Sequence, residues 1–407
     1  MKKRIFAVLL SFILIFLFTG CEPKIGGQLS QKEKLEDFNY MYEVIKDGYP
    51  FLEVNKRLNN IDWLVNKEKY EELVQKTGND EDFINVLNNI VKDLKNGHTH
   101  IIQPKDSYMF DLLKNGYEPL GWYDFFEDSK VIERYDQDEK ETSSSKSKNE
   151  MNKIIAKDLI LTDTIDGKVG YMHLPQMGRS NSPIEDDIKL IGKYLVGLDN
   201  HQALIIDIRG NSGGSDLYWK NIVSMLVDKP MPVDGFVLFR SGEVIDNYAQ
   251  RREISLNNIN NLVALKLENI PTEVATSFNG YVKLENTIPS NKVSNFNGNI
   301  YLLVDGSVYS SSESFAIFAK DTGFATLIGQ RTGGDGGGFD PVLFALPNSG
   351  IIARMSADMY LTPRGICNEE HKTTPDYVID DVTIRNQPGS FANDKCIQKV
   401  LELEKLN

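Results

Sequence analysis

The residues best suited to chemistry in this chain are serines that follow a buried apolar strand. Residues 301–304 are apolar, and after a short polar turn the chain continues through Ser310, Ser311 and Ser312 into an apolar helix. A serine at a strand-to-helix turn projects its hydroxyl at the sheet edge, where the first N–H groups of the helix can stabilise an oxyanion. The same serine can simply cap the helix, with Glu313 completing a capping box. This segment alone leaves both interpretations open.

A glycine-rich turn ends a second buried strand. Residues 203–208 are apolar except for Asp207, and the chain then reads Arg-Gly-Asn-Ser-Gly-Gly over residues 209–214. Glycines in such a turn let the backbone approach a ligand closely and offer N–H donors. The turn lacks the Gly-Lys-Ser/Thr ending and the Gly-x-Gly-x-x-Gly spacing of nucleotide-binding loops, which disfavours a phosphate site. An ordinary tight turn is the alternative.

Two histidines supply a candidate general base. Only five histidines occur in the chain, and His98 and His100 lie two residues apart at the end of a predicted helix. A serine nucleophile needs a base, and histidine is the commonest one. On a strand the two side chains would share a face, as metal ligands do, but no nearby cysteine or histidine offers a third ligand. We therefore expect no metal and no cofactor. The alternative is that these are surface or core histidines without a chemical role.

The elements that must position these segments fall into two regions. Apolar residues at helical spacing predict helices from Leu35 to Ile45 and from Phe83 to Leu94, within an N-terminal helical domain over residues 34–97. A strand–loop–helix pattern predicts an α/β catalytic domain over residues 168–407. Its expected strands and helices are, in chain order, strand 169–174, helix 184–198, strand 203–208, strand 299–304, helix 312–320 and strand 325–328.

A connecting segment over residues 98–167 joins the two regions. It contains a low-complexity loop at residues 134–152, in which acidic residues give way to serines and lysines without any apolar period. The segment is too short for a typical additional domain, so we expect no inserted folded module.

The N-terminus has the layout of a bacterial export signal. Lys2, Lys3 and Arg4 precede an apolar stretch over residues 5–18, and small residues then lead directly to Cys21. This pattern predicts a signal peptide over residues 1–20, a lipidated Cys21 and a polar tether over residues 21–33. The mature protein would then lie on the outer face of the bacterial cell membrane. A plain signal peptide or an uncleaved anchor is the alternative.

The composition of the 407-residue chain is that of a globular protein, with 41% apolar and 25% charged residues. Its formal net charge of -13 argues against nucleic acid as a partner. Export would permit a disulfide between Cys367 and Cys396, but the sequence does not decide whether their Cα atoms lie close enough.

In their joint order these segments resemble the C-terminal-processing, or tail-specific, serine protease family and its tricorn-like branch, over residues 34–385. The glycine-rich strand end resembles Asp207–Gly214, and the Ser-x-x-Glu turn of the nucleophile resembles Ser310–Glu313. A Gly-x-x-Thr-x-Gly motif matches residues 329–334, and an acid-then-Pro-Asp motif matches residues 369–376. The resemblance implies an α/β fold with a crotonase/Clp-protease-like core, and a serine peptidase.

The resemblance also implies which base acts. The processing branch uses a lysine directly after the Gly-x-x-Thr-x-Gly motif, but this chain has Asp335 there. The tricorn-like branch uses a histidine from the N-terminal segment, which His98 matches. In that branch a serine before the histidine bridges it to an acid, and here that residue is Gly97. Thr99 or a direct carboxylate contact would have to substitute.

Near the C-terminus, Glu369 aligns best with the acid of the tricorn-like branch and Glu370 is second. The N–H groups of Gly213 and Ser311 are the expected oxyanion donors, and Glu313 is expected to support the helix rather than act on substrate.

These roles predict an exported, lipid-anchored serine endopeptidase that acts on peptides or proteins. His98 would take the proton of Ser310, which attacks the peptide carbonyl. A non-catalytic ligand-binding protein on the same fold and a lipid-anchored serine esterase are the competing predictions. Cleavage specificity and oligomeric state are left open.

Overall fold

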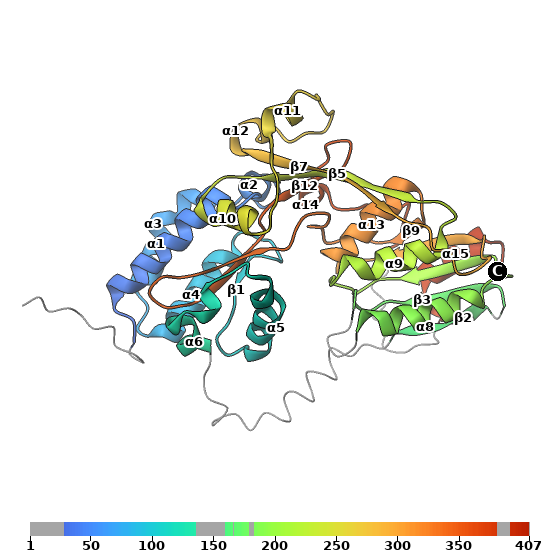
Figure 1. The fold of residues 1–407 in the computed structure, drawn as a ribbon, viewed down its shortest axis with the longest axis horizontal. Helices are drawn as coiled ribbons and strands as arrows, with labels where there is room; N and C mark the ends of the chain where they lie inside the picture. Colours follow the sequence, from blue (N-terminus) through green and yellow to red (C-terminus); the bar gives the residue numbers. More distant parts are fainter. Residues whose placement is uncertain (1–27, 136–158, 166, 179–182, 381–390, 407) are drawn as a thin grey trace, which may run out of the picture.

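A six-stranded sheet forms the centre of one lobe in the computed structural model, which describes residues 28–135, 159–165, 167–178, 183–380 and 391–406 (Figure 1). Its strand order is β13-β9-β8-β4-β3-β2, and every neighbouring pair is parallel except β2–β3. The strands are β2 (Ile160–Ile165), β3 (Val169–His173), β4 (Ala203–Asp207), β8 (Asn299–Val304), β9 (Thr326–Gly329) and β13 (Tyr377–Val378). The predicted strands near residues 169, 203, 299 and 325 are confirmed.

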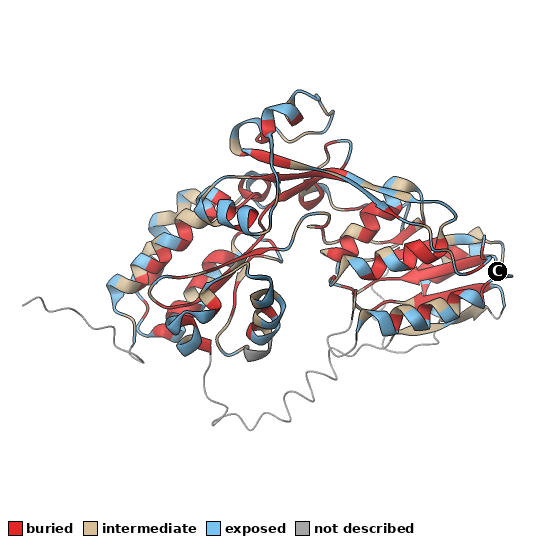
Figure 2. Ribbon diagram, in the orientation of Figure 1, coloured by how far each residue is buried: buried red, intermediate tan, exposed pale blue. Residues whose placement is uncertain are grey.

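Helices cover both faces of this sheet. One face packs against α8 (Ile184–Val196), α9 (Asp216–Leu226) and α13 (Ser311–Thr322) through a buried apolar cluster. The other face packs against α15 (Lys395–Leu403). Burial on both sides explains why β4 and β8 read as continuous apolar runs in the sequence, and Figure 2 shows these central strands in the buried colour.

Two long antiparallel strands extend from this lobe toward the N-terminal lobe (Figure 1). The four-stranded sheet has the order β12-β5-β7-β6. Its strands are β5 (Met231–Phe239), β6 (Asn257–Asn258), β7 (Gly280–Ile288) and β12 (Met359–Leu361), and the short helices beside it are α10 (Glu243–Arg251), α11 (Ile259–Val263), α12 (Val274–Ser277) and α14 (Asn368–His371).

The N-terminal lobe contains the two helices that the sequence predicted, α1 (Gln31–Gly48) and α4 (Asp80–Lys92). Between them lie α2 (Leu52–Asn59) and α3 (Lys67–Gln75). A full capping box at Ser30 starts α1, three residues before the predicted end of the tether. These helices share one buried cluster with residues 236–239 and 342–367, so their core is completed by the C-terminal half of the chain.

A third sheet joins the two halves of the sequence beside the candidate site. Its order is β1-β11-β10, with β1 (His100–Ile101), β10 (Val342–Ala345) and β11 (Ile352–Met355) all antiparallel. The connecting segment is also more ordered than predicted. It forms α5 (Ser107–Tyr117) and α6 (Ser129–Tyr135), whose apolar residues pack on Leu343 and Ile352. These short helices are stabilised by that tertiary packing, which the local pattern does not reveal.

Several sequence predictions lie outside the described residues. They are the signal peptide, Cys21, most of the tether and nearly all of the loop at 134–152. Within the described residues, no helix is both long and apolar enough to cross a membrane. Cys367 and Cys396 are both buried free thiols and form no disulfide. They belong to different apolar clusters, which accounts for the separation.

Candidate active site

Ser310 lies at the junction between β8 and α13 with an unusual backbone. Its φ is 58° and its ψ is -125°, a conformation that costs a non-glycine residue free energy. Its side chain makes no capping hydrogen bond to the helix. The capping interpretation of Ser310 is therefore wrong, because the hydroxyl leaves the helix N–H groups unsatisfied. A strained residue with an unused hydroxyl at a strand-to-helix turn is the arrangement of a nucleophile elbow.

The glycine-rich turn contacts this elbow directly. A Cβ added at Gly213, whose φ is +114°, would lie 2.9 Å from the Cβ of Ser310 and 3.2 Å from the N atom of Ser311. Only glycine permits so close an approach. The buried Asn211 fixes the turn: its Oδ1 accepts hydrogen bonds from the Gly213 N–H at 2.9 Å and from the Ser312 hydroxyl at 2.6 Å.

The two predicted oxyanion donors therefore differ in this conformation. The Gly213 N–H is already donated to Asn211. The Ser311 N–H donates no hydrogen bond to any residue that the structure describes, and it stands at the positive end of α13. The Ser311 N–H is therefore free to donate to an oxyanion in this conformation. The Gly213 N–H must first break its hydrogen bond to Asn211.

His98 follows α4 and forms a short hydrogen bond with an unexpected acid. Its Nδ1 lies 2.8 Å from Oδ2 of Asp335, and each side chain is only 12% exposed. Burial acts to raise the pKa of Asp335, but the charge of His98 and hydrogen bonds from His98, Asn96 and Ser356 outweigh it and lower the pKa to about 2. Asp335 is thus ionised at neutral pH, so Nδ1 of His98 donates and Oδ2 of Asp335 accepts in this hydrogen bond.

Tyr309 connects His98 and Ser310. The His98 and Tyr309 rings pack with their centroids 4.8 Å apart, and Tyr309 directly precedes Ser310. The Ser310 hydroxyl and His98 make no hydrogen bond with each other in the described structure. Such contacts are often long before substrate binds, so this geometry is compatible with proton transfer in a substrate complex.

The Tyr309 side chain also occupies the space that a side chain at position 97 would need, which fits the glycine found there. A Cβ at Gly97 would lie 3.0 to 3.2 Å from the Tyr309 ring and its hydroxyl oxygen. That hydroxyl donates to Asp335 Oδ2 at 3.1 Å and accepts the Gly97 N–H at 3.1 Å. Burial, followed by the charges of Asp335 and Glu369, raises the pKa of Tyr309, so the phenol stays protonated. The Tyr309 hydroxyl thus bonds Asp335, whereas His98 contacts Asp335 directly. Of the two substitutes proposed from sequence, the direct carboxylate contact is the one observed, and Thr99 instead donates to Asn96 Oδ1.

Glu369 and Glu370 lie close by but do not contact His98. Glu369 is buried, pairs with Lys372 at 2.6 Å and accepts a hydrogen bond from Asn96. The same Asn96 amide donates to Asp335 at 2.8 Å, so Glu369 reaches the histidine only through other groups. Glu370 points elsewhere and pairs with Arg57. The carboxylate in contact with His98 is Asp335, not the predicted Glu369.

Glu313 holds neighbouring segments together. Its Oε1 accepts hydrogen bonds from Asn368 and Thr373, at 2.7 and 2.6 Å, instead of completing a capping box. Burial raises the pKa of this carboxyl. These contacts tie α13 to α14 and to the segment after it, in keeping with a supporting place beside the site.

Family comparisons agree with this geometry. The family model described as Peptidase family S41 matches residues 168–379, more than half of the chain. The chain belongs to peptidase family S41. A second model, the tricorn protease C1 domain, matches residues 30–92. The predicted C-terminal-processing family is thereby confirmed.

Solved structures share the fold of this S41 peptidase. A putative peptidase from Parabacteroides merdae is 18% identical with a TM-score of 0.57, over 91% of this chain and 96% of that one. Mature CPAF complexed with lactacystin is 16% identical with a TM-score of 0.56, over 92% and 98%. A protein of Chlamydia trachomatis serovar D is 26% identical over 42% of this chain, and the match covers only 34% of that relative.

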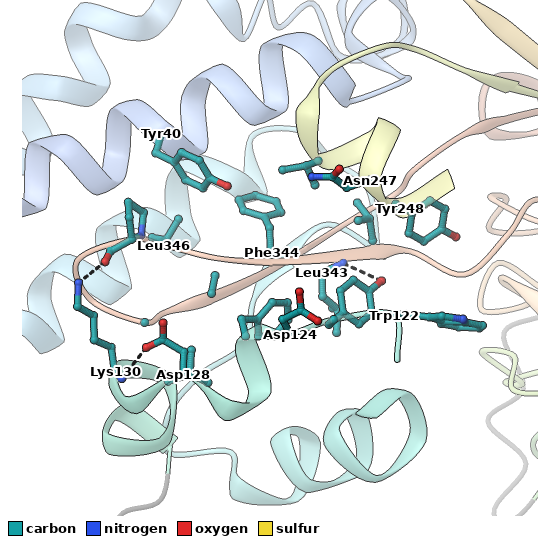
Figure 3. Close-up of a pocket in the computed structure, with 18 of the residues that line it drawn as sticks. Tyr40, Trp122, Asp124, Asp128, Lys130, Asn247, Tyr248, Leu343, Phe344 and Leu346 are labelled. Atoms are coloured by element: carbon teal, nitrogen blue, oxygen red, sulfur yellow. Dashed lines mark hydrogen bonds between the residues drawn. The ribbon is translucent and has the colours of Figure 1, made fainter. Parts of the chain in front are cut away.

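One cavity of the S41 peptidase borders the elbow and another lies apart from it. A cavity of about 280 Å³ includes Ser314, whose hydroxyl donates to the Ser310 carbonyl, and is walled by apolar residues such as Ile317 and Phe318. A second cavity of about 310 Å³ lies between Tyr40 and the β10 strand, and neither His98 nor Ser310 lines it (Figure 3). Within the described residues, no group of three or more His, Cys, Asp or Glu side chains is placed to hold a metal ion.

Opposite pKa shifts at Glu369 and Glu370 predict opposite pH dependences of stability. Burial, followed by the charge of Asp335, raises the pKa of Glu369 from 4.5 to about 7, so between these values the folded protein keeps a proton that the unfolded chain has lost. The Glu369 contribution to the free energy of unfolding should therefore fall between pH 4.5 and 7, by on the order of 2 kcal/mol. Relative to wild type, Glu369→Gln should gain stability across this window in urea unfolding.

Glu370→Gln is the matched control. Its hydrogen bond to Arg57 lowers the pKa of Glu370, so its contribution is present above pH 4.5 and lost as pH falls below that value. This variant should lose stability relative to wild type as pH rises toward 4.5. If the difference in free energy of unfolding between variant and wild type changed with pH in the same direction for both variants, the opposite pKa shifts of Glu369 and Glu370 would be contradicted.

Proposed function

We propose that this S41 protein is an endopeptidase that uses Ser310 as nucleophile and His98 as general base. The observation that carries the proposal is the uncapped, strained Ser310, set beside a histidine whose other ring nitrogen is held by an ionised carboxylate. The hydroxyl oxygen of a helix-capping serine would accept a hydrogen bond from a backbone N–H of the helix. A structural histidine would not need a buried anion. Together the three side chains have the roles that acyl transfer requires.

In the proposed mechanism, Nε2 of His98 accepts the Ser310 proton as the hydroxyl oxygen attacks the substrate carbonyl. Asp335 keeps the Nδ1 proton in place and stabilises the imidazolium that forms. The Ser311 N–H donates to the developing oxyanion, and the Gly213 N–H joins it once it leaves Asn211. The imidazolium then protonates the leaving amine, and a water attacks the acyl-enzyme by the reverse sequence of proton transfers.

Reaction with a fluorophosphonate probe tests this assignment in the wild-type protein. We expect a covalent adduct that mass spectrometry locates on Ser310, together with cleavage of an unstructured protein such as casein. An adduct with ester turnover but no peptide cleavage would identify a serine esterase. A protein that neither reacts with the probe nor cleaves either substrate would be a binding protein on this fold.

We also propose that the protein is exported and held by lipid on the outer face of the bacterial membrane. The basic, apolar and small residues before Cys21 support this proposal. Replacing Cys21 with serine should move the protein from the membrane fraction to the soluble fraction in its native host. Equal membrane retention of the variant would favour an uncleaved N-terminal anchor.

A further inference from the structure

Arg354 is a half-buried arginine of β11. Its guanidinium makes no hydrogen bond and no ion pair with any residue that the structure describes. Other arginines are paired with carboxylates, namely Arg57, Arg134, Arg209, Arg251 and Arg252. Withdrawing a charge from water without a counter-ion is costly. Burial lowers the pKa of Arg354, but a guanidinium stays charged in proteins, so the cost is not relieved by deprotonation.

The register of the β1–β11 pair places Arg354 beside the catalytic residues. His100 lies opposite Arg354, and Ile101 lies opposite Ala353. His98 precedes β1 by two residues, and Ser356 directly follows β11. The Ser356 hydroxyl donates to Asp335 Oδ2 at 2.8 Å, and Asp335 holds His98. Arg354 is therefore two residues from Ser356, roughly 7 Å along an extended chain, and Ser356 shares Asp335 with the proposed catalytic His98.

The charged groups around Arg354 are already engaged or neutral. Asp335 is bound to His98, and Asp340 is ion-paired with Arg252. Burial, followed by the charge of Arg354, lowers the pKa of His100 to about 4, so His100 is neutral at pH 7. Tyr117 and Tyr309 are protonated phenols with raised pKa values. Among Arg354 and the residues paired with it, His100 and Leu343, Arg354 carries the charge. Its guanidinium has five N–H donors.

We propose that Arg354 binds a carboxylate of the peptide substrate within a few residues of the scissile bond. A guanidinium recognises a carboxylate through two parallel hydrogen bonds, and pairing would satisfy the buried charge. Two residues of an extended substrate peptide also span roughly 7 Å. The carboxylate can come from an Asp or Glu side chain or from a free C-terminus. This inference builds on the proposed peptidase function and names its substrate class.

Peptide selection by the Ser310→Ala protein tests the proposal without requiring catalysis. The probes are amidated hexapeptide pools with Glu or Gln fixed at each position in turn, and a Gln pool with a free C-terminus. Mass spectrometry measures which peptides the protein retains from equimolar mixtures. At one position we expect the Glu peptides to be retained roughly tenfold to a hundredfold over the Gln peptides, the range for a charge-assisted hydrogen bond. Retention of the free-carboxyl pool instead would identify the C-terminus as the source.

Arg354→Gln on the same background should reduce this preference to near one, and Arg354→Lys should restore part of it. Arg251→Gln is the matched control. It removes the same charge from the separate cavity of about 310 Å³, where Arg251 pairs with Asp124, and should leave the preference unchanged. Equal retention of all pools, or a preference that survives Arg354→Gln, would overturn the proposal. Failure of the peptidase assignment would appear separately, as absence of the probe adduct on wild-type Ser310.

Discussion

Replacing Ser310 with alanine should abolish fluorophosphonate labelling and reduce kcat for peptide cleavage by roughly 10⁶-fold. Alanine keeps the Cβ that packs against Gly213 but lacks the hydroxyl oxygen that would form the acyl bond. Ser310 makes no capping hydrogen bond, so the hydroxyl contributes little to the stability of α13. The thermal unfolding midpoint should therefore stay close to that of the wild type while activity disappears. Gel-based labelling, kcat and a thermal melt check the three expectations.

Ser312→Ala provides the neighbouring control. The Ser312 hydroxyl is fully buried and donates to Asn211, so its loss should lower stability and disturb the glycine-rich turn. The variant should nevertheless keep the covalent label on Ser310. If labelling persisted in Ser310→Ala and vanished in Ser312→Ala, the nucleophile would be Ser312 and the present assignment would be wrong.

The fold of the central sheet could be predicted because its signals are local. β4 and β8 are unbroken apolar runs, and α1 and α4 place their apolar residues at helical spacing. The long strands β5 and β7 were not predicted. Parts of both strands are exposed and polar, as at Asp234 and Glu285, so neither reads as a buried strand. Their pairing is decided by contacts between segments far apart in sequence.

The candidate site divides in the same way. Ser310 and His98 could be found from motif order, since each lies within a short recognisable segment. The acid could not, because the position of Asp335 was recognised only as a place where a lysine was missing. The Tyr309 hydroxyl was overlooked for a related reason: it meets Gly97 across 212 positions of sequence. The available signal was Asp335 itself, an acid at the position where the family has a lysine. An acid at that position is suited to pair with a histidine, as it does with His98.

The charge on Asp335 gives the second large expected effect. Asp335→Asn should lower kcat by roughly 10⁴-fold, as the corresponding change does in a Ser-His-Asp peptidase. Oδ2 of Asp335 accepts hydrogen bonds from Asn96, Tyr309 and Ser356 as well as the short bond from His98. An amide in this position lacks the negative charge that stabilises the imidazolium, and its NH₂ group favours the tautomer in which Nε2 is protonated. The kcat of purified variants, measured between pH 6 and 9, tests this expectation.

Two variants separate a direct effect of Asp335 from a general effect of nearby acids. Glu369→Gln should reduce kcat by no more than about tenfold, since Glu369 contacts Lys372 and Asn96 but not the histidine. Asp340→Asn removes an equal charge that is paired with Arg252 and should leave kcat near that of the wild type. The reverse order, with Glu369→Gln far more damaging than Asp335→Asn, would assign the orienting acid to Glu369. In that case substrate binding must rearrange Asn96, because this amide now separates Glu369 from His98.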